Sequence, residues 1–258
     1  MPSKLKAAGK IVIATDATYP PNEFLPEGAG SPVGMDIDLG NAIGQLLGLK
    51  VDWQKAGFDG ILAGINAGRY DMSLSSFTDT KDREKQVNFV TYFRAGVSTM
   101  VPKGNPEKIN TYADLCGKSV GAENGTTELD MLTKPDVDLS IVKSCKDAGK
   151  QPPKAQGYPK QTDVNSALDA GRIEAYLADT PVVDYAVKVT GDKFEKVGKD
   201  QGIAPYGIAI PKNPAELTPL VQQAVQKLMD DGDYAKILSN WGVQAGAITK
   251  SEVNKATS

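Results

Sequence analysis

Residues 36–53 read DIDLGNAIGQLLGLKVDW and contain the two kinds of element from which the fold is predicted. In residues 36–48 apolar side chains recur every three or four positions, which predicts an amphipathic helix. Residues 49–53 predict a strand, and residues 10–15 (KIVIAT) predict another strand before the helix. This order is typical of α/β folds with largely parallel sheets. The apolar residues of the helical face are Leu39, Ile43, Leu46 and Leu47.

The same alternation of elements continues to residue 241. Asp59 is the expected N-cap of a second helix, which ends near Gly68. The polar residues 247–258 are expected to be mobile. Further strands are predicted at residues 70–77, 119–122, 154–158, 174–178 and 206–210, and further helices at residues 164–170, after Asn213-Pro214, and at residues 234–241.

Two extended segments, residues 96–103 and 202–211, divide the chain. They predict a two-lobed protein in which residues 1–100 and 206–258 form lobe 1 and residues 101–205 form lobe 2. A ligand cleft is expected between two such lobes. We expect the two segments to act as a hinge that closes on the ligand.

The composition excludes several classes of function. With 29 Lys and Arg against 32 Asp and Glu, the chain lacks the basic surplus by which proteins bind nucleic-acid backbones. The sequence contains no His, which removes the usual general base, the commonest transition-metal ligand and any Ser-His-Asp triad. No apolar run approaches the roughly 18–20 residues of a membrane-spanning helix. We therefore expect no nucleic-acid partner, no metal site and no cofactor.

The other short motifs indicate no nucleotide-binding, metal-binding or redox function. Gly117-Lys118-Ser119 lacks the earlier glycine of a P-loop, so we interpret it as a loop without nucleotide-binding function. Cys116 and Cys145 fit no metal-binding or redox spacing. Their spacing leaves two alternatives open, two buried thiols or one disulfide.

Residues 75–83 (SSFTDTKDR) contain the densest group of candidate binding side chains. Hydroxyl groups at the end of a predicted strand precede Arg83 at the start of a predicted helix, and an arginine fork suits a carboxylate ligand. The alternative is an ordinary turn in which Thr80 caps the helix and Arg83 is a solvated surface charge. The chain has only four arginines among its 29 basic residues, which favours a binding role for Arg83.

Several motifs in a fixed order resemble the family 3 solute-binding proteins, the polar amino-acid receptors of ABC importers. The resemblance covers about residues 10–242. It implies a periplasmic-binding-protein type II fold with two α/β lobes. The motifs are TDATYPP (15–21), GMDIDL (34–39), FDGI (58–61), residues 76–89, GAENGTT (121–127), LDAGRIEA (168–175) with Ala178-Asp179, and DGDYAKI (231–237).

The resemblance also implies roles for site residues. Arg83 would bind the α-carboxylate of the ligand, assisted by the hydroxyl and amide of Thr78. The backbone N–H groups of Thr126 and Thr127 would assist as well, and they stand where a helix is expected to begin. A helix N-terminus presents unpaired N–H groups to an anion, so this assignment has independent physical support.

The remaining ligand groups follow from the same resemblance. Asp179 would pair with the α-ammonium group, together with the carbonyl of Ser76. The rings of Tyr19 and Phe58 would enclose the ligand side chain, and core packing is the alternative for both rings. Ser75 completes the candidate set beside Ser76.

Two acidic residues bear on which amino acid is bound. Asp16 and Glu123 would lie near the distal end of the pocket, where two carboxylates favour a cationic side chain. Alternatively, Asp16 braces the Tyr19 loop and Glu123 faces solvent, which would leave a neutral polar ligand possible.

The sequence departs from the family pattern in two places. Asn22-Glu23-Phe24 replaces a phenylalanine directly after the loop prolines, and Asp79 replaces an apolar residue between two hydroxyl positions. The pair Cys116 and Cys145 resembles the pair in actinobacterial members, which implies a disulfide between them in lobe 2.

The resemblance implies a monomeric, non-enzymatic receptor outside the cytoplasm, periplasmic or at the cell surface, that passes a polar amino acid to an ABC permease. Members of this family are often lipid-anchored through an N-terminal Cys, so we expect such an anchor in a targeting segment that this sequence lacks. A dehydratase of the prephenate or arogenate type is one alternative, with Glu123 or Asp179 as general acid. The ligand-binding domain of a sensor is another.

Overall fold

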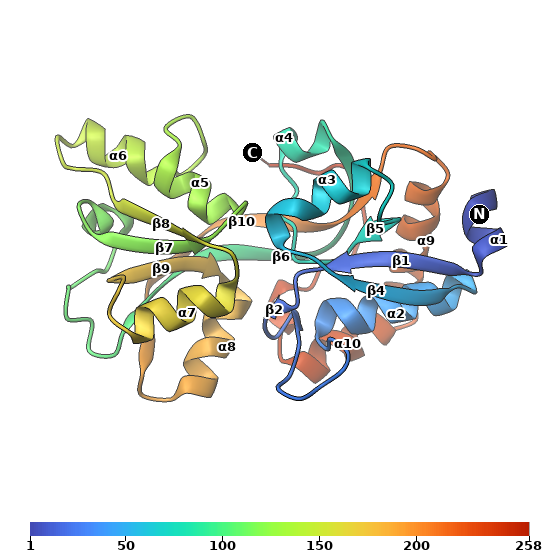
Figure 1. Cartoon of the computed structure of the whole chain (residues 1–258), viewed down its shortest axis with the longest axis horizontal. Coiled ribbons are helices and arrows are strands. Elements are labelled where there is room, and N and C mark those ends of the chain that lie inside the picture. Colours follow the sequence, from blue (N-terminus) through green and yellow to red (C-terminus); the bar gives the residue numbers. More distant parts are fainter. Residues whose placement is uncertain (258) are drawn as a thin grey trace. The chain divides into compact units, whose positions relative to one another are not determined.

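The computed structural model describes residues 1–257, which form two compact units (Figure 1). Unit 1 comprises Met1–Arg94 and Ala204–Thr257, and unit 2 comprises Ala95–Ile203. The strands β6 (Val87–Pro102) and β10 (Phe194–Pro211) are neighbours that run through both units. The chain therefore passes between the units twice. No helix within residues 1–257 has both the length and the apolar character that crossing a membrane requires.

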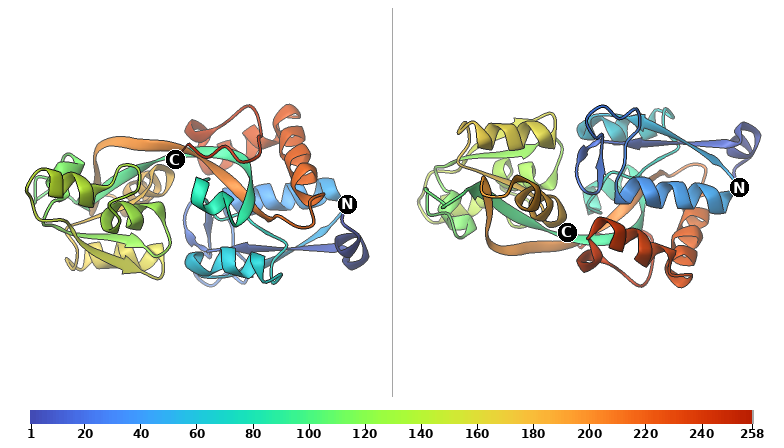
Figure 2. Two further views of the ribbon diagram at one scale, coloured as in Figure 1. Left: turned by 90° about the horizontal axis from the view of Figure 1, so that it is seen from above. Right: turned by 90° about the horizontal axis from the view of Figure 1, so that it is seen from below.

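Unit 1 has a mixed sheet with strand order β4-β1-β5-β10. β1 pairs in parallel with β4 and β5, and β10 pairs antiparallel with β5. Figure 2 shows α2, α9 and α10 on one face of this sheet and α3 on the other. The elements are α1 (Ser3–Ala8), β1 (Lys10–Thr15), β2 (Thr18–Tyr19), β3 (Glu23–Phe24), α2 (Met35–Leu47), β4 (Lys50–Lys55), η1 (Phe58–Gly60), α3 (Ile61–Asn66), β5 (Met72–Ser73), α4 (Lys81–Glu84), α9 (Leu217–Asp230), α10 (Asp233–Trp241) and η3 (Gln244–Gly246).

The helix and strand of residues 36–53 pack closely because two helix positions lack a side chain. A Cβ atom on Gly40 would lie 2.6 Å from the ring of Trp53, and one on Gly44 would lie 2.4 Å from Val51 Cγ2. Small residues on α2 thus let β4 approach. The predicted helical face is buried at Leu39 and Ile43, but Leu46 is 40% exposed because it lies at the solvent edge of the helix.

Unit 2 has the strand order β6-β9-β7-β8. β7 pairs in parallel with β8 and β9, whereas β9 pairs antiparallel with β6. α5 and α6 lie on one face of the sheet and α7 on the other (Figure 1). The elements are η2 (Tyr112–Leu115), β7 (Ser119–Glu123), α5 (Thr127–Thr133), α6 (Ile141–Asp147), β8 (Lys154–Tyr158), α7 (Gln161–Asp169), β9 (Ala175–Asp179) and α8 (Thr180–Thr190).

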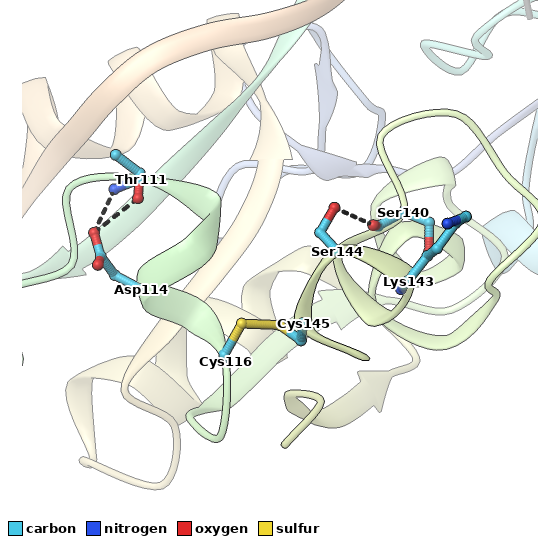
Figure 3. Close-up of a disulfide and its surroundings, with 7 residues drawn as sticks. All are labelled: Thr111, Asp114, Cys116, Ser140, Lys143, Ser144 and Cys145. Atoms are coloured by element: carbon cyan, nitrogen blue, oxygen red, sulfur yellow. Dashed lines mark hydrogen bonds between the residues drawn. A yellow bond between two sulfur atoms is a disulfide. The ribbon is translucent and has the colours of Figure 1, made fainter. Parts of the chain in front are cut away.

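Cys116 and Cys145 form a disulfide, with Cα atoms 5.6 Å apart (Figure 3). The bond joins the end of η2 to α6, and Cys145 lies in the apolar core of unit 2 beside Leu115 and Ile141. The pairing implied by the family resemblance is confirmed.

Three local predictions were wrong. Asp59 is not an N-cap, because residues 58–60 form a 3-10 turn and α3 starts after Gly60. The strand predicted at residues 70–77 is limited to Met72–Ser73, since the chain then bends at Ser76, which has a left-handed backbone conformation.

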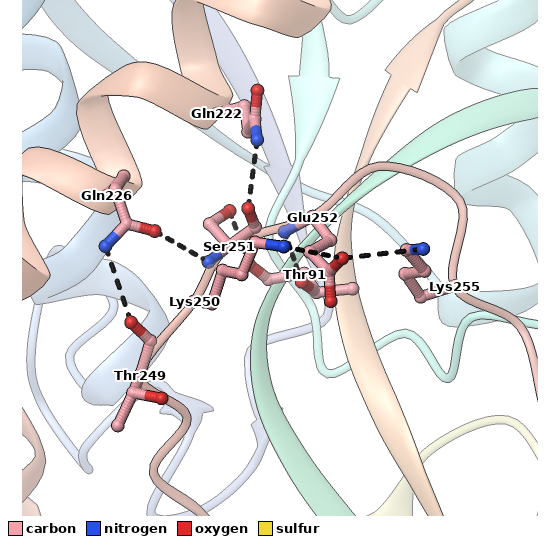
Figure 4. Close-up of polar contacts among 8 residues, drawn as sticks. All are labelled: Thr91, Gln222, Gln226, Thr249, Lys250, Ser251, Glu252 and Lys255. Carbon is pink, nitrogen blue, oxygen red and sulfur yellow. Dashed lines mark hydrogen bonds and ion pairs between the residues drawn. The ribbon is translucent and has the colours of Figure 1, made fainter.

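The third wrong prediction is the mobility of the C-terminal tail, residues 247–258. Its described residues are docked on unit 1, contrary to the predicted mobility (Figure 4). Gln222 Nε2 donates to the carbonyl of Ser251, and the N–H of Ser251 donates to Gln226 Oε1, both at 2.9 Å. Polar composition suggested mobility, but these polar groups have partners. Ser258 lies outside the described residues.

Candidate ligand-binding site

Residues 75–83 leave β5 and turn beside β10 within unit 1. Ser76 adopts a left-handed backbone conformation with φ of 49°, which bends the chain sharply. The chain then pairs with β10: Thr78 forms an antiparallel bridge with Tyr206, and the N–H of Asp79 donates to the carbonyl of Pro205 at 2.9 Å. The backbone of Thr78 is therefore fixed by the sheet.

Buried polar side chains hold the bend at Ser76. The N–H of Ser76 donates to Asp36 Oδ2 at 2.9 Å, and its hydroxyl donates to Glu23 Oε2 at 3.0 Å. Asn22 Nδ2 donates to the same hydroxyl at 3.0 Å. These partners stabilise a conformation that a serine would otherwise adopt only at a cost.

Glu23 and Asp36 form a buried acidic pair. Neither residue was among the site residues that we predicted from the sequence. Burial raises the pKa of Asp36 to about 6, although hydrogen bonds from Ser76 and Tyr92 oppose the rise. Burial, and next the charge of Asp36, raise the pKa of Glu23 well above its usual range. The pair thus retains a proton at pH values where exposed carboxyls have lost theirs. Asp36 precedes Leu39 and Ile43 by three and seven positions, a signal that could have revealed its burial.

Arg83 is held by contacts within the same segment. Thr80 caps α4 by accepting from the N–H of Arg83 at 3.3 Å, a feature that the alternative interpretation of this segment had suggested. Arg83 Nη1 donates to the carbonyl of Thr78 at 2.8 Å. The guanidinium carbon lies 5.6 Å from the ring centre of Phe58 and 5.2 Å from that of Phe77, within cation–π range. The half-buried guanidinium group is therefore oriented by the protein.

The other predicted residues of unit 1 surround this segment. The N–H of Asp16 donates to Ser75 Oγ at 2.8 Å, and Asp16 Oδ2 accepts from the N–H of Phe58 at 3.0 Å. The Phe58 ring stacks on Phe77 with centroids 4.2 Å apart, and Tyr19 in β2 is buried. Asp16 therefore braces the turn that carries Phe58, and its carbonyl accepts from the N–H of Thr18 at 2.8 Å in the loop that leads to Tyr19.

The predicted residues of unit 2 lie where two parallel strands end. Glu123 ends β7, Asp179 ends β9, and both side chains are buried. The side chain of Thr126 caps α5: its oxygen accepts from the N–H of Leu129 at 3.3 Å and donates to the carbonyl of Glu123 at 2.7 Å. Thr127 begins α5. Carboxyl ends of strands in open α/β sheets are common ligand sites.

The predicted residues thus fall into two sets, each brought together within its own unit. The described residues contain no group of three or more potential ligands that could hold a metal ion. The set in unit 1 is Asp16, Tyr19, Phe58, Ser75, Ser76, Thr78 and Arg83, and the set in unit 2 is Glu123, Thr126, Thr127 and Asp179.

Comparison with known families decides the class of the protein. The model of the bacterial extracellular solute-binding proteins, family 3, matches residues 11–244. The chain belongs to this family. The match confirms the resemblance found in the sequence motifs and leaves residues 245–258 outside the family model.

Individual relatives agree with the family. The arginine-binding protein ArgT of Corynebacterium glutamicum is 29% identical over 255 residues, which cover 99% of this chain and 81% of that protein. The L-cystine-binding protein TcyJ of Escherichia coli K12 is 28% identical over 240 residues, 93% of this chain and 85% of that protein.

The fold agrees as well. The structure of an ancestral arginine-binding protein bound to arginine matches with a TM-score of 0.79 and 35% identity. The match covers 90% of this chain and 98% of that one. Family 3 proteins of this kind have the type II periplasmic-binding-protein fold, and this chain has it too, which confirms the predicted fold class.

Proposed function

We propose that this family 3 protein is a non-enzymatic extracytoplasmic receptor that binds a polar amino acid and delivers it to an ABC permease. The observation that best supports the proposal is the fixed orientation of the Arg83 side chain. Its guanidinium group is held by the carbonyl of Thr78 and lies over two aromatic rings, so it is oriented before any ligand arrives. An oriented arginine fork is the side chain best suited to a carboxylate.

The α-carboxylate of the ligand would bind Arg83, the hydroxyl and amide of Thr78, and the N–H groups of Thr126 and Thr127. The sharp bend at Ser76 and the bridge between Thr78 and Tyr206 support this assignment, because they fix the backbone that carries the donors. Preorganised donors lose little conformational entropy on binding.

The α-ammonium group would pair with Asp179 and the carbonyl of Ser76. Asp179 is buried at the end of β9, with 7% of its surface exposed, and a cationic ligand group would compensate the charge of its carboxylate. An Asp179→Asn variant should bind the amino acid more weakly. The same variant should discriminate less against a ligand that lacks the α-amino group.

We propose that the ligand side chain is cationic, with L-arginine as the first candidate. Asp16 and Glu123 are 4% and 2% exposed, and buried carboxylates favour a positively charged ligand group. The rings of Tyr19 and Phe58 would contact its apolar stem. Two of the relatives described above are named as arginine-binding proteins, and one is named as a cystine-binding protein.

A dehydratase function is less well supported than a binding function. Both curated relatives described above are named as binding proteins, and nothing about Glu123 or Asp179 distinguishes a general acid from a ligand-binding group. Incubation with prephenate or arogenate should therefore produce no new aromatic absorbance. Turnover would replace the receptor proposal.

The proposal is tested by a thermal-shift screen of the twenty amino acids with ornithine, citrulline and cystine. A ligand at 100 times its dissociation constant adds about 2.7 kcal/mol to the unfolding free energy, which is readily detected. We expect L-arginine to give a clear shift. Stabilisation by glutamine but not by arginine or lysine would contradict the cationic assignment, and no shift with any amino acid would contradict the receptor proposal.

A further inference from the structure

The C-terminal residues 249–257, here named the C-terminal strap, run along β6 in unit 1 (Figure 4). Val253 forms an antiparallel bridge with Val90, and the N–H of Thr91 donates to the carbonyl of Glu252 at 2.8 Å. Asn254 closes the pairing: its N–H donates to the carbonyl of Phe89 at 2.9 Å. The strap is therefore an added, strand-like segment of unit 1 and not a loose tail.

Beyond Asn254 the strap reaches the segment that carries Arg83. The N–H of Lys255 donates to Asp79 Oδ2 at 2.7 Å, and the next N–H, of Ala256, donates to Glu84 Oε1 at 3.0 Å. Asp79 stands just before α4 and is fully buried, whereas Glu84 is the last residue of α4. Two consecutive amides of the strap thus fix both ends of this helix.

α4 needs such support because it has only four residues. A single helical turn is not stable by itself, so its position depends on tertiary contacts. Asp79 is also one of the positions at which the chain departs from the family pattern, and the strap lies outside the residues that the family model matches. The two departures contact each other directly.

We propose that Asp79 and the C-terminal strap position Arg83 for the ligand carboxylate. This inference rests on the proposed amino-acid site. Asp79 is a positioning residue: its side chain binds the strap, its own N–H binds the carbonyl of Pro205, and the neighbouring Thr78 carbonyl accepts from Arg83. Loosening the strap would let α4 and the guanidinium group move away from their present geometry.

The test compares four variants with the full chain: a chain ending at Asn254, Asp79→Ala, Asp79→Asn and Lys255→Ala. The first two remove the contact between Asp79 and the amide of Lys255. Asp79→Asn keeps an acceptor oxygen, and Lys255→Ala keeps the amide and removes only an exposed side chain with its ion pair to Glu252. Circular dichroism and melting temperature confirm that each variant is folded.

The first measurement is hydrogen–deuterium exchange without ligand at the amides of Arg83 and Glu84, which bond to Thr80. We expect faster exchange in the shortened chain and in Asp79→Ala, and exchange close to wild type in Asp79→Asn and Lys255→Ala. Unchanged exchange in the shortened chain would overturn the proposal, and so would equal acceleration in Asp79→Asn and Asp79→Ala.

The second measurement is calorimetry with L-arginine. Affinity should fall about tenfold in the shortened chain and in Asp79→Ala, the size expected for losing one hydrogen bond to a charged group. Asp79→Asn and Lys255→Ala should bind nearly as wild type does. Faster exchange with unchanged affinity would show a merely structural strap and would overturn the positioning role. If the wild-type chain does not bind L-arginine, the proposed ligand is wrong, and the exchange measurement alone decides whether the strap fixes α4.

Discussion

Residues 75–83 of unit 1 and residues 123–127 of unit 2 both turn at the end of a strand and both lead into a short helix, but their partners lie at different distances along the chain. The bend at Ser76 depends on Glu23 and Asp36, which are 53 and 40 positions away. The turn at Thr126 depends on Glu123 and Leu129, each three positions away. The bend at Ser76 is thus fixed by tertiary structure, whereas the cap at Thr126 is local, although the N–H of nearby Asn124 also donates to the carbonyl of Tyr158 at 2.7 Å.

This difference determines how each segment responds to mutation. Removing one partner of the unit 1 segment leaves buried donors unpaired in a part of the chain far from the mutation. Removing a partner in unit 2 changes one helix cap and little else. The predictions below test this contrast, in order of decreasing effect.

The largest effect is expected for Asp36→Ala. This change leaves the N–H of Ser76 and the hydroxyl of Tyr92 without their acceptor. Because both donors are buried, the unfolding free energy should fall by about 2–5 kcal/mol. Asp38→Ala on the same helix removes one half-buried acceptor, that of Trp241 Nε1, and should cost about 1 kcal/mol. Denaturant titration of both variants measures the difference. Equal costs would show that the Ser76 bend does not depend on Asp36.

The next effect concerns unit 2. Replacing Cys116 and Cys145 together by alanine removes a covalent link across 29 positions. In the chain-entropy model this loss lowers the unfolding free energy by roughly 3–4 kcal/mol. Hydrogen exchange should accelerate across unit 2 and remain unchanged at residues 75–83. Faster exchange in residues 75–83 as well would mean that the two segments are not independent.

The buried acids predict an unusual pH dependence. Asp36 has a pKa of about 6 when folded and an ordinary value when unfolded, so the folded protein holds more protons between about pH 4 and 6. The resulting stabilisation is complete below this window and is lost as the pH rises through it, by at most about 3 kcal/mol. Glu23 faces the same group, and because its pKa is raised well above the usual range it belongs to the same titration, whereas Tyr92, whose pKa burial also raises, stays protonated and donates to Asp36 throughout.

The measurement is the unfolding free energy of wild type and of Asp36→Asn between pH 4 and 7. The wild-type curve should fall with rising pH, and the variant's curve should be flatter over that window. Parallel curves would show that Asp36 titrates as an exposed carboxyl.

The smallest effect compares two matching helix caps. Thr80 and Thr126 each accept a hydrogen bond at 3.3 Å from the N–H three positions later. Alanine at either position should cost about 1 kcal/mol. Thr126→Ala should cost the more, because the hydroxyl of Thr126 also donates to Glu123. Equal melting temperatures for the two variants would remove that distinction.

The same contrast explains what the sequence could and could not predict. The strands β1 and β8 were predicted with the bounds that the structure shows, because composition over five or six residues decides them. The cap by Thr80 is also local, and the sequence suggested it as part of the alternative interpretation of residues 75–83. The Glu23–Asp36 pair and the strap contact at Asp79 join residues that no short window contains, since Lys255 is 176 positions from Asp79.

The cysteines and the candidate site show the value and the limit of resemblance. Spacing alone left the pairing of Cys116 and Cys145 open, and the family resemblance resolved it correctly. The same resemblance selected residues that the structure gathers within each unit. Their ligand roles remain predictions, since a binding role depends on contacts with a molecule that the sequence does not contain.

The central claim is that this protein binds an amino acid through Arg83, and calorimetry with L-arginine tests it most directly. Arg69→Ala is the matched control, because Arg69 lies over the ring of Tyr70 in the same unit and is exposed. Loss of one partner of a desolvated charge pair costs roughly 2–5 kcal/mol, so Arg83→Ala should weaken binding at least about thirtyfold. Arg69→Ala should bind as wild type does. Wild-type affinity in a folded Arg83→Ala variant would contradict the account.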